Sequence, residues 1–290
     1  MLTNLAFLIL IHLFAWVWVR RLRHFDAFLM MRGAGVAAVA LLSLPLAVGG
    51  MRAVLICVLA LMWAARSISH QLQRERWLGP DRGLQEWAAR LGPRADWRLL
   101  TRLVLGQATI LWACSIPIQR GVITGIAFPA SALDRVGLVL VVAGMGFEAL
   151  ADHQLLVFQR ADEADNQVLS TGLWRWSRHP NHFGTFVVSV GFYSLAAAGG
   201  DGFWSLLGPL VTLPICTRLL GGAASETRRI HRRPGYRAYQ YATSKFVPWP
   251  PLDPADAPMP AQALRYFPTE VTPDTVAETD ETGGASRERA

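Results

Sequence analysis

The stretch VGLVLVVAGMGFEALADHQLLVF, residues 136–158, indicates the class of fold. Every residue before Glu148 in this stretch is apolar or glycine. Its length is close to the ~20 residues with which a helix spans ~30 Å of hydrocarbon. Glu148 and Asp152 stand in the last two turns. The stretch therefore predicts a transmembrane helix that carries acidic residues near one end.

The composition of the whole chain agrees with this prediction. The 290 residues are 52% hydrophobic and 17% charged, whereas soluble domains carry about 25% charged residues. This composition excludes a disordered chain, a collagen-like chain and a coiled coil. Six other runs are apolar over a similar length, namely residues 2–19, 33–48, 53–69, 99–118, 183–198 and 203–220. We expect an all-α, polytopic membrane protein with about seven transmembrane helices, in which the last two runs could instead form one hairpin.

The basic residues are distributed unevenly between these runs. The segments after the first, third, fifth and seventh runs hold most of the arginines, and the other loops hold only Arg52, Arg120 and Arg135. Because cytoplasmic loops carry an excess of Lys and Arg, we expect the N-terminus outside and the C-terminus in the cytoplasm. The net charge is +7. Since the arginines lie between apolar runs, we expect membrane lipids and no nucleic acid as partners.

The composition changes at residue 250. Residues 251–290 hold eight acidic residues and three arginines, are rich in Pro, Ala and Thr, and show no apolar periodicity. We therefore predict a transmembrane domain over 1–250 and a disordered acidic tail over 251–290. The three cysteines lie far apart in apolar runs, so they are interpreted as small buried hydrophobes, and no metal site is predicted.

Polar residues are unusual at four places, all on the predicted cytoplasmic side. At the first, Glu148 and Asp152 are spaced i, i+4 and share one helix face. Ionisable groups in membrane helices usually face a protein interior or a wet cavity, although a helix end that reaches water would also explain them. The second place is the loop NQVLSTGLWRWSRHPNHFG, residues 166–184, whose arginines offer paired donors to phosphate or carboxylate groups.

The other two places are less specific. In residues 225–245, Glu226, Arg229, Tyr236, Arg237 and Tyr239 could close over a ligand, or the segment could bind anionic lipid. Residues 63–82 contain Arg66, Asp81 and Arg82, and the simpler interpretation of this segment is a solvated loop.

The motif GLWRWSRHPNHFG, residues 172–184, resembles the signature of DUF1295, a family of bacterial membrane proteins related to the C-terminal domain of steroid 5-alpha-reductases. The resemblance extends upstream to Glu148, Asp152 and Gln154, and downstream to RRPGYRAYQYATSKFVP at 232–248. It covers about residues 60–250. More distantly, the loop is similar to the RHPxYxG motif of isoprenylcysteine carboxyl methyltransferases.

The resemblance implies a multi-pass protein, of the bacterial inner membrane, that is an oxidoreductase acting on CH–CH groups. NADPH would reduce a carbon–carbon double bond of an apolar lipid, steroid-like or isoprenoid substrate. The implied catalytic candidates are Glu148, His182 and Glu226. The implied cofactor-binding residues are Asp152, Arg175, Arg178, Asn181, Arg229, Tyr236 and Arg237.

The chain departs from the family pattern at two positions of the motif region. His182 stands where the family has tyrosine, and Thr185 stands where it has glutamate. The early tyrosine and glutamate that polarise a steroid ketone have no counterpart, so steroid specificity is not implied. Two alternatives remain open: a methyltransferase that uses S-adenosylmethionine on a lipid or prenylated substrate, and a non-catalytic membrane protein.

Overall fold

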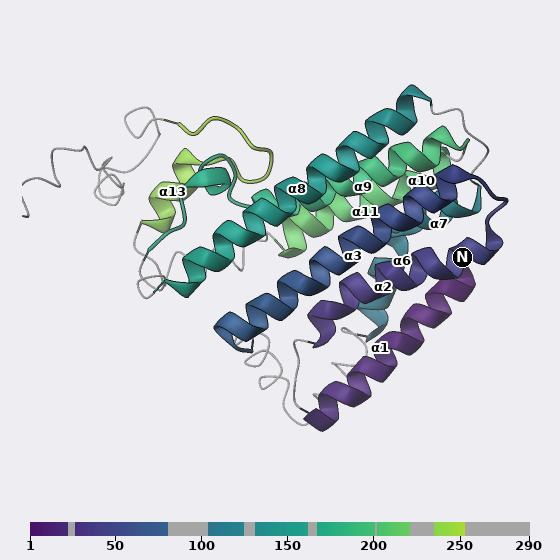
Figure 1. Ribbon diagram of the computed structural model, residues 1–290. Coiled ribbons are helices and arrows are strands. Elements are labelled where there is room, and N and C mark those ends of the chain that lie inside the picture. Colours follow the sequence, from purple (N-terminus) through teal and green to yellow (C-terminus); the bar gives the residue numbers. More distant parts are fainter. Residues whose placement is uncertain are drawn as a thin grey trace, which may run out of the picture.

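The computed structural model describes residues 1–22, 27–80, 104–124, 131–161, 167–200, 202–220 and 235–252. Over these ranges the elements are helices, and no strand occurs. The predicted all-α fold is therefore confirmed. Five long helices run side by side in Figure 1, namely α1 (Leu2–Leu22), α2 (Ala27–Ser43), α3 (Met51–Leu78), α8 (Ala132–Arg160) and α9 (Pro180–Ala198).

Shorter helical pieces complete the described chain. They are η1 (Leu44–Leu46), α6 (Gln107–Cys114), α7 (Ile116–Ile123), η4 (Gly172–Arg175), α10 (Gly202–Ser205), α11 (Leu207–Pro214), the π-helix η5 (Ile215–Leu220) and α13 (Tyr236–Ala242). All seven predicted apolar runs coincide with helices where they are described, except that the second run leaves its helix after Leu46. The fourth run is divided at Ser115, two residues before Pro117, and the seventh is divided into α10, α11 and η5. Proline lacks the amide hydrogen that an unbroken helix needs.

Within the described ranges, two helical stretches are long and apolar enough to cross a membrane, residues Leu29–Leu46 and Met51–Leu78. The second differs from the sequence prediction. The predicted apolar run ended at residue 69, whereas α3 continues to Leu78. The helix ends where Gly79 adopts a positive φ of 73°, a conformation that favours glycine. The count of seven spans and the orientation stay predictions.

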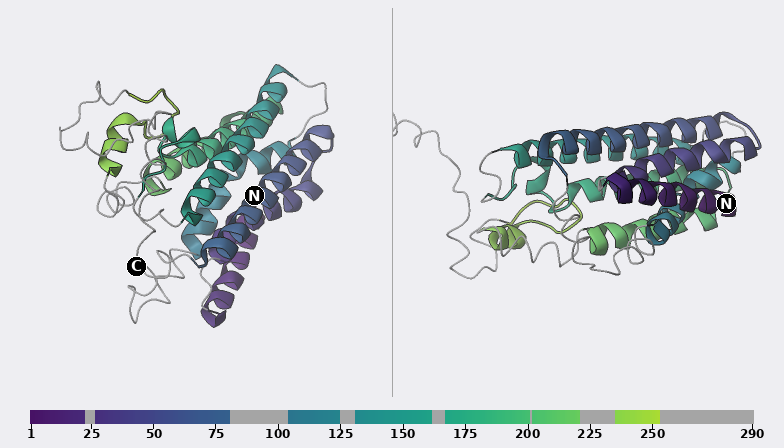
Figure 2. Two further views of the ribbon diagram at one scale, coloured as in Figure 1. Left: turned by 60° about the vertical axis from the view of Figure 1, so that its left-hand side comes forward. Right: turned by 90° about the horizontal axis from the view of Figure 1, so that it is seen from below.

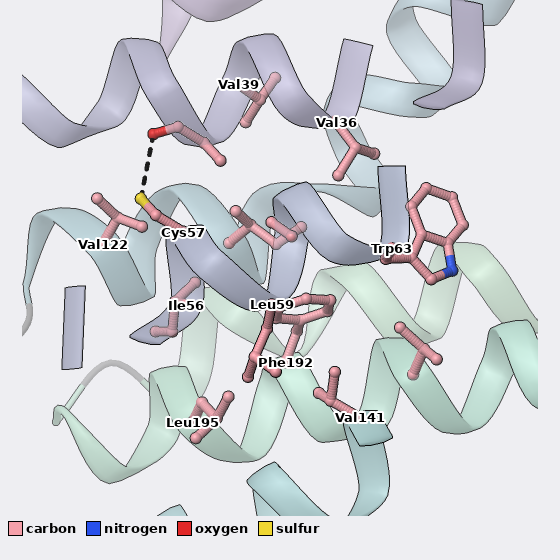
Figure 3. Packing of buried hydrophobic residues seen from close by; sticks show 14 of the residues in the cluster. Val36, Val39, Ile56, Cys57, Leu59, Trp63, Val122, Val141, Phe192 and Leu195 are labelled. Atoms are coloured by element: carbon pink, nitrogen blue, oxygen red, sulfur yellow. Dashed lines mark hydrogen bonds between the residues drawn. The ribbon is translucent and has the colours of Figure 1, made fainter. Parts of the chain in front are cut away.

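The apolar core lies between α2, α3, α7, α8 and α9. In Figure 3, Ile56 and Leu59 of α3 face Phe192 and Leu195 of α9, with Val141 of α8 beside them. Ile56, Leu195 and Val141 are fully buried. Cys57 and Cys216 are free and buried, as predicted, whereas Cys114 is half-buried.

Helices α8 and α9 approach each other closely at two glycines. A Cβ atom on Gly184 would lie 2.7 Å from the backbone nitrogen of Glu148, and one on Gly191 would lie 2.7 Å from that of Val141. Any larger residue would push the helices apart. This contact brings the beginning of α9 to the turn of α8 that carries the acidic residues.

Helices α3 and α8 run parallel to each other (Figure 1) and are joined by ion pairs at two levels. Near the beginning of both helices, Arg52 donates two hydrogen bonds to Asp134, at 2.8 and 2.9 Å, and both side chains are buried. Asp134 also completes a capping box with Ser131. Arg66 and Glu148 form the second pair, and each pair joins residues 82 positions apart. The two helices are therefore fixed in one register.

Polarity is distributed inside out along the bundle. The outward faces of the long helices carry exposed apolar side chains, for example Phe14 at 69% and Val139 at 64% exposure. The interior, in contrast, holds polar side chains that are at most 6% exposed, namely Asn4, His12, Arg52, Gln119, Asp134, Glu148 and Asp152. Water-soluble proteins bury their polar groups less readily than this.

Candidate functional site

Two carboxylates of α8, Glu148 and Asp152, are buried against α3. Arg66 of α3 bridges them, with Nη2 at 2.6 Å from Glu148 Oε1 and Nη1 donating to Asp152 Oδ2 at 2.9 Å. Trp63 donates from Nε1 to Glu148 Oε2 at 2.9 Å. The two acids share one helix face, as predicted, and of the two explanations left open for them the protein interior is the one observed, since Glu148 is 2% and Asp152 is 6% exposed.

A second arginine reaches the same cluster from α2. Arg32 Nη2 lies 3.8 Å from Glu148 Oε1 and donates to Ser67 Oγ at 3.3 Å. The guanidinium carbon stands 5.4 Å from the centre of the Trp63 ring. Two arginines thus face two carboxylates. This balance is what a buried carboxylate requires, because an unpaired buried charge is strongly destabilising.

Helix α9 supplies the next contact. Asn181 donates from Nδ2 to Asp152 Oδ1 at 3.1 Å, and its Oδ1 accepts the backbone N–H of His182 at 3.0 Å. His70 Nε2 of α3 lies 3.9 Å from Asp152 Oδ2. Since an amide NH₂ carries two hydrogens, Asn181 keeps one donor beyond its contact with Asp152. We call Arg66, Glu148, Asp152 and Asn181 the buried network.

The loop before α9 is fixed to the last turns of α8. The backbone N–H of Leu173 donates to Gln154 Oε1 at 3.0 Å, and Trp174 Nε1 donates to the carbonyl of Ala151 at 3.1 Å. Trp174 is 4% exposed. Gln154, which the family resemblance singled out, therefore holds the loop in place.

The loop also pairs with the segment around α13. Arg178 N donates to Ser244 O at 2.8 Å, and Trp249 N donates to Trp176 O at 3.0 Å. Tyr239 adds a 2.6 Å hydrogen bond from its hydroxyl to the carbonyl of Trp174. We call residues 171–179 and 235–252 together the cap. In Figure 2, α13 lies outside the bundle, at the end where α8 terminates.

The structure brings together only some of the predicted site residues. Glu148, Asp152 and Asn181 belong to the buried network, and His182 follows directly, its ring stacked on His179 at 5.4 Å between centroids. Four other predicted residues lie on the cap, where Tyr236 is buried, Arg178 is half-buried, and Arg175 and Arg237 are exposed. Two predicted residues, Glu226 and Arg229, lie outside the described residues.

Sequence reasoning named Arg66 but did not place it, or any other residue of α2 and α3, against the carboxylates. The helix expected over 53–69 includes Trp63 and Arg66, which point at the carboxylates, whereas the interpretation as a solvated loop is wrong up to Leu78, where α3 ends. The signal was present, since Trp63, Arg66, Ser67 and His70 follow the i, i+3, i+4, i+7 spacing of one helix face. Arg32 gave no comparable signal.

The comparisons with known proteins give one match. A family model described as a protein of unknown function, DUF1295, matches residues 15–243. Neither the curated proteins nor the solved structures contain a match to the chain. The matched range includes the buried network and the first part of the cap.

Proposed function

The chain belongs to the DUF1295 family, and from that premise we propose that it is a membrane-embedded, NADPH-dependent reductase. Its substrate would be a carbon–carbon double bond in an apolar lipid, isoprenoid or steroid-like molecule. The observation that carries the proposal is the buried network of Arg66, Glu148, Asp152 and Asn181. Fixed polar groups in a dry interior stabilise a reacting centre without reorganisation, and intramembrane charges of this kind usually mark function.

The inside-out polarity supports the membrane part of the proposal. Outward apolar faces such as those with Phe14 and Val139 suit hydrocarbon. The parallel course of α3 and α8 agrees with their places as the third and fifth of seven spans. Two of the proposed spans are broken, which membranes tolerate where neighbouring helices satisfy the freed backbone groups. We propose the N-terminus outside and the C-terminus, with the cap, in the cytoplasm, in a bacterial inner membrane.

The chemistry of the cap supports the choice of cofactor. Arg175, Arg178 and Arg237 lie on the cap, and neither 167–200 nor 235–252 contains an acidic residue. This donor set fits a ligand with several phosphate charges, because guanidinium groups hold phosphate through paired hydrogen bonds. Arg178, Asn181 and Asp152 would hold the cofactor near the bundle, with Arg175, Arg229, Tyr236 and Arg237 nearer the cytoplasm.

When bound, NADPH would supply the hydride, and the protein would hold the polar side chains around the reacting groups in fixed positions. Arg66 and Trp63 fix Glu148, and Asn181 fixes Asp152. His182, at the first turn of α9, is the described candidate for the group that holds the proton added with the hydride. Thr185 bonds to the carbonyl of Asn181 at 3.2 Å and so remains within its own helix.

The methyltransferase alternative is less well supported by the described residues. A sulfonium ion would favour an available carboxylate nearby. Glu148 and Asp152 are already paired with Arg66, and the cap contributes no acid. The two cofactors therefore make opposite electrostatic demands.

A binding comparison tests the proposal. We expect purified protein in detergent to bind NADPH in a calorimetric titration and to bind S-adenosylmethionine weakly or not at all. Binding of S-adenosylmethionine alone would support the methyltransferase. Binding of neither would support a non-catalytic membrane protein and end the reductase proposal.

A further inference from the structure

The cap is basic and carries no acidic residue. Its two segments, 171–179 and 235–252, contain no Asp or Glu. They hold four basic residues, Arg175, Arg178, Arg237 and Lys245, of which Lys245 is the single lysine of the protein. The proposed reductase activity accounts for some of the arginines. It gives no role to Lys245 or to the aromatic residues that the cap exposes.

The cap has a buried face and an exposed face. Trp174 and Tyr239 are buried and joined by a hydrogen bond, whereas Trp176 and Tyr241, two residues further along each segment, are 45% and 37% exposed. Buried Thr243 is likewise followed by exposed Lys245. Large apolar groups continue along the exposed side, with Val247, Trp249 and Leu252 at 54%, 68% and 49% exposure.

Hydrogen bonds hold the exposed face in one shape. Trp249 N bonds to Trp176 O, so the two exposed tryptophans stand on paired stretches of backbone. Leu252 N bonds to Ala242 O at 2.9 Å, and Ser177 Oγ bonds to Phe246 O at 2.8 Å. A binding partner would therefore meet a preformed surface and would not need to order it.

The ends of α3 and α8 also carry a tryptophan and an arginine. Helix α8 ends with Arg160, whose guanidinium carbon lies 4.9 Å from the centre of the Trp77 ring in the last turn of α3. Trp77 is 39% exposed. Exposed tryptophans and cations thus lie both on the cap and on the ends of α3 and α8.

We infer that the exposed face of the cap is a docking surface for the headgroups of anionic phospholipids. Tryptophan and tyrosine prefer the depth at which headgroups meet hydrocarbon, and cations are attracted to anionic lipid at about fivefold in affinity for each charge near the surface. The absence of acids from the cap removes the repulsion that this surface would otherwise meet. A second copy of the same cationic face would be repelled. The inference goes beyond the proposed reductase activity and does not depend on it.

The first test measures where Trp249 lies. The full chain is reconstituted in vesicles of phosphatidylcholine and phosphatidylglycerol in equal parts, with either lipid brominated near the headgroup end of its chains. The fluorescence of Trp249 is obtained by subtracting the emission of the Trp249→Phe variant from that of the wild type. We expect the brominated lipids to quench this emission and aqueous iodide to quench it little. Full quenching by iodide and none by the lipids would overturn the inference.

The second test measures the preference for anionic lipid. Binding of a fluorescent phosphatidylglycerol to the detergent-solubilised protein is compared among Lys245→Gln, Lys245→Arg and Arg76→Gln. We expect Lys245→Gln to weaken binding about fivefold, and Lys245→Arg to leave it unchanged because the charge is kept. Arg76→Gln removes an exposed charge of α3 outside the cap and should change little.

Three results of the second test would overturn the inference. Equal losses in Lys245→Gln and Arg76→Gln would indicate a general effect of net charge. Displacement of the lipid by NADPH would assign the cap to the cofactor instead. Association of the protein into dimers, without any lipid binding, would identify a second copy as the occupant.

Discussion

Arg66 contacts both carboxylates of α8, so its removal would leave two buried anions close together. We expect Arg66→Ala to lower the free energy of unfolding by about 3–5 kcal/mol, the usual result of breaking a buried ion pair. Thermal unfolding in detergent measures this loss. Arg76→Ala is the control, since Arg76 is exposed on the same helix and should cost less than about 0.5 kcal/mol. Equal melting temperatures of the two variants would show that the bridge from Arg66 to the carboxylates contributes nothing to stability.

The cofactor site is also tested residue by residue. Arg178→Lys keeps the charge but loses the planar pair of donors, so we expect NADPH affinity to fall about 10- to 150-fold, equivalent to about 1.5–3 kcal/mol. Asn181→Ala should cost less, about 1 kcal/mol, because a neutral hydrogen bond is lost. Calorimetric titration measures both.

The control for these two variants is Arg135→Lys, an exposed residue at the opposite end of α8. Its affinity for NADPH should equal that of the wild type. Unchanged affinity in both Arg178→Lys and Asn181→Ala would remove the assignment of the cofactor site.

At the level of elements, the α8–α9 contact depends on its glycines. In Gly184→Ala the new methyl group would lie 2.7 Å from the Glu148 nitrogen. We expect the helices to separate at a cost of about 1–3 kcal/mol in unfolding free energy. Gly146→Ala is a matched control on α8, because a Cβ atom there meets nothing within 4 Å. Its effect should be neutral or stabilising by up to about 1 kcal/mol.

Thermal unfolding of the Gly184→Ala and Gly146→Ala variants measures these changes in stability. A Gly184→Ala protein as stable as Gly146→Ala would mean that the helices can separate freely. In that case the beginning of α9 would not be held against Glu148 by close packing.

At the level of the whole molecule, the proposed topology predicts which residues face outward. Phe203→Cys, an 80% exposed position at the beginning of α10, should react with an impermeant thiol reagent applied to intact cells. Thr171→Cys on the cap should react only after the cells are opened. Labelling of Thr171→Cys in intact cells would reverse the orientation. The native cysteines are replaced by alanine in both variants.

The sequence predicted the helices better than it predicted their ends and contacts. Apolar runs locate these helices because a helix needs apolar side chains whether it packs in a protein core or faces lipid. The end of α3 was missed, since residues 71–78 are polar and yet helical. The shared face of Glu148 and Asp152 followed from local spacing. Their partners Trp63 and Arg66 did not, because these contacts span 85 and 86 residues and depend on how two helices pack.

The constant separation of 82 residues between the partners of α3 and α8 has a consequence for synthesis of the protein. A ribosome that adds about 5–20 residues per second would deliver Asp134 and Glu148 about 4–16 s after Arg52 and Arg66. During that delay α3 would carry two unneutralised arginines in or near the lipid. Long arginine side chains can reach toward the headgroups from the ends of a helix, which makes the wait tolerable. The arrival of α8 would then draw both arginines inward, so α8 would complete the assembly of α3.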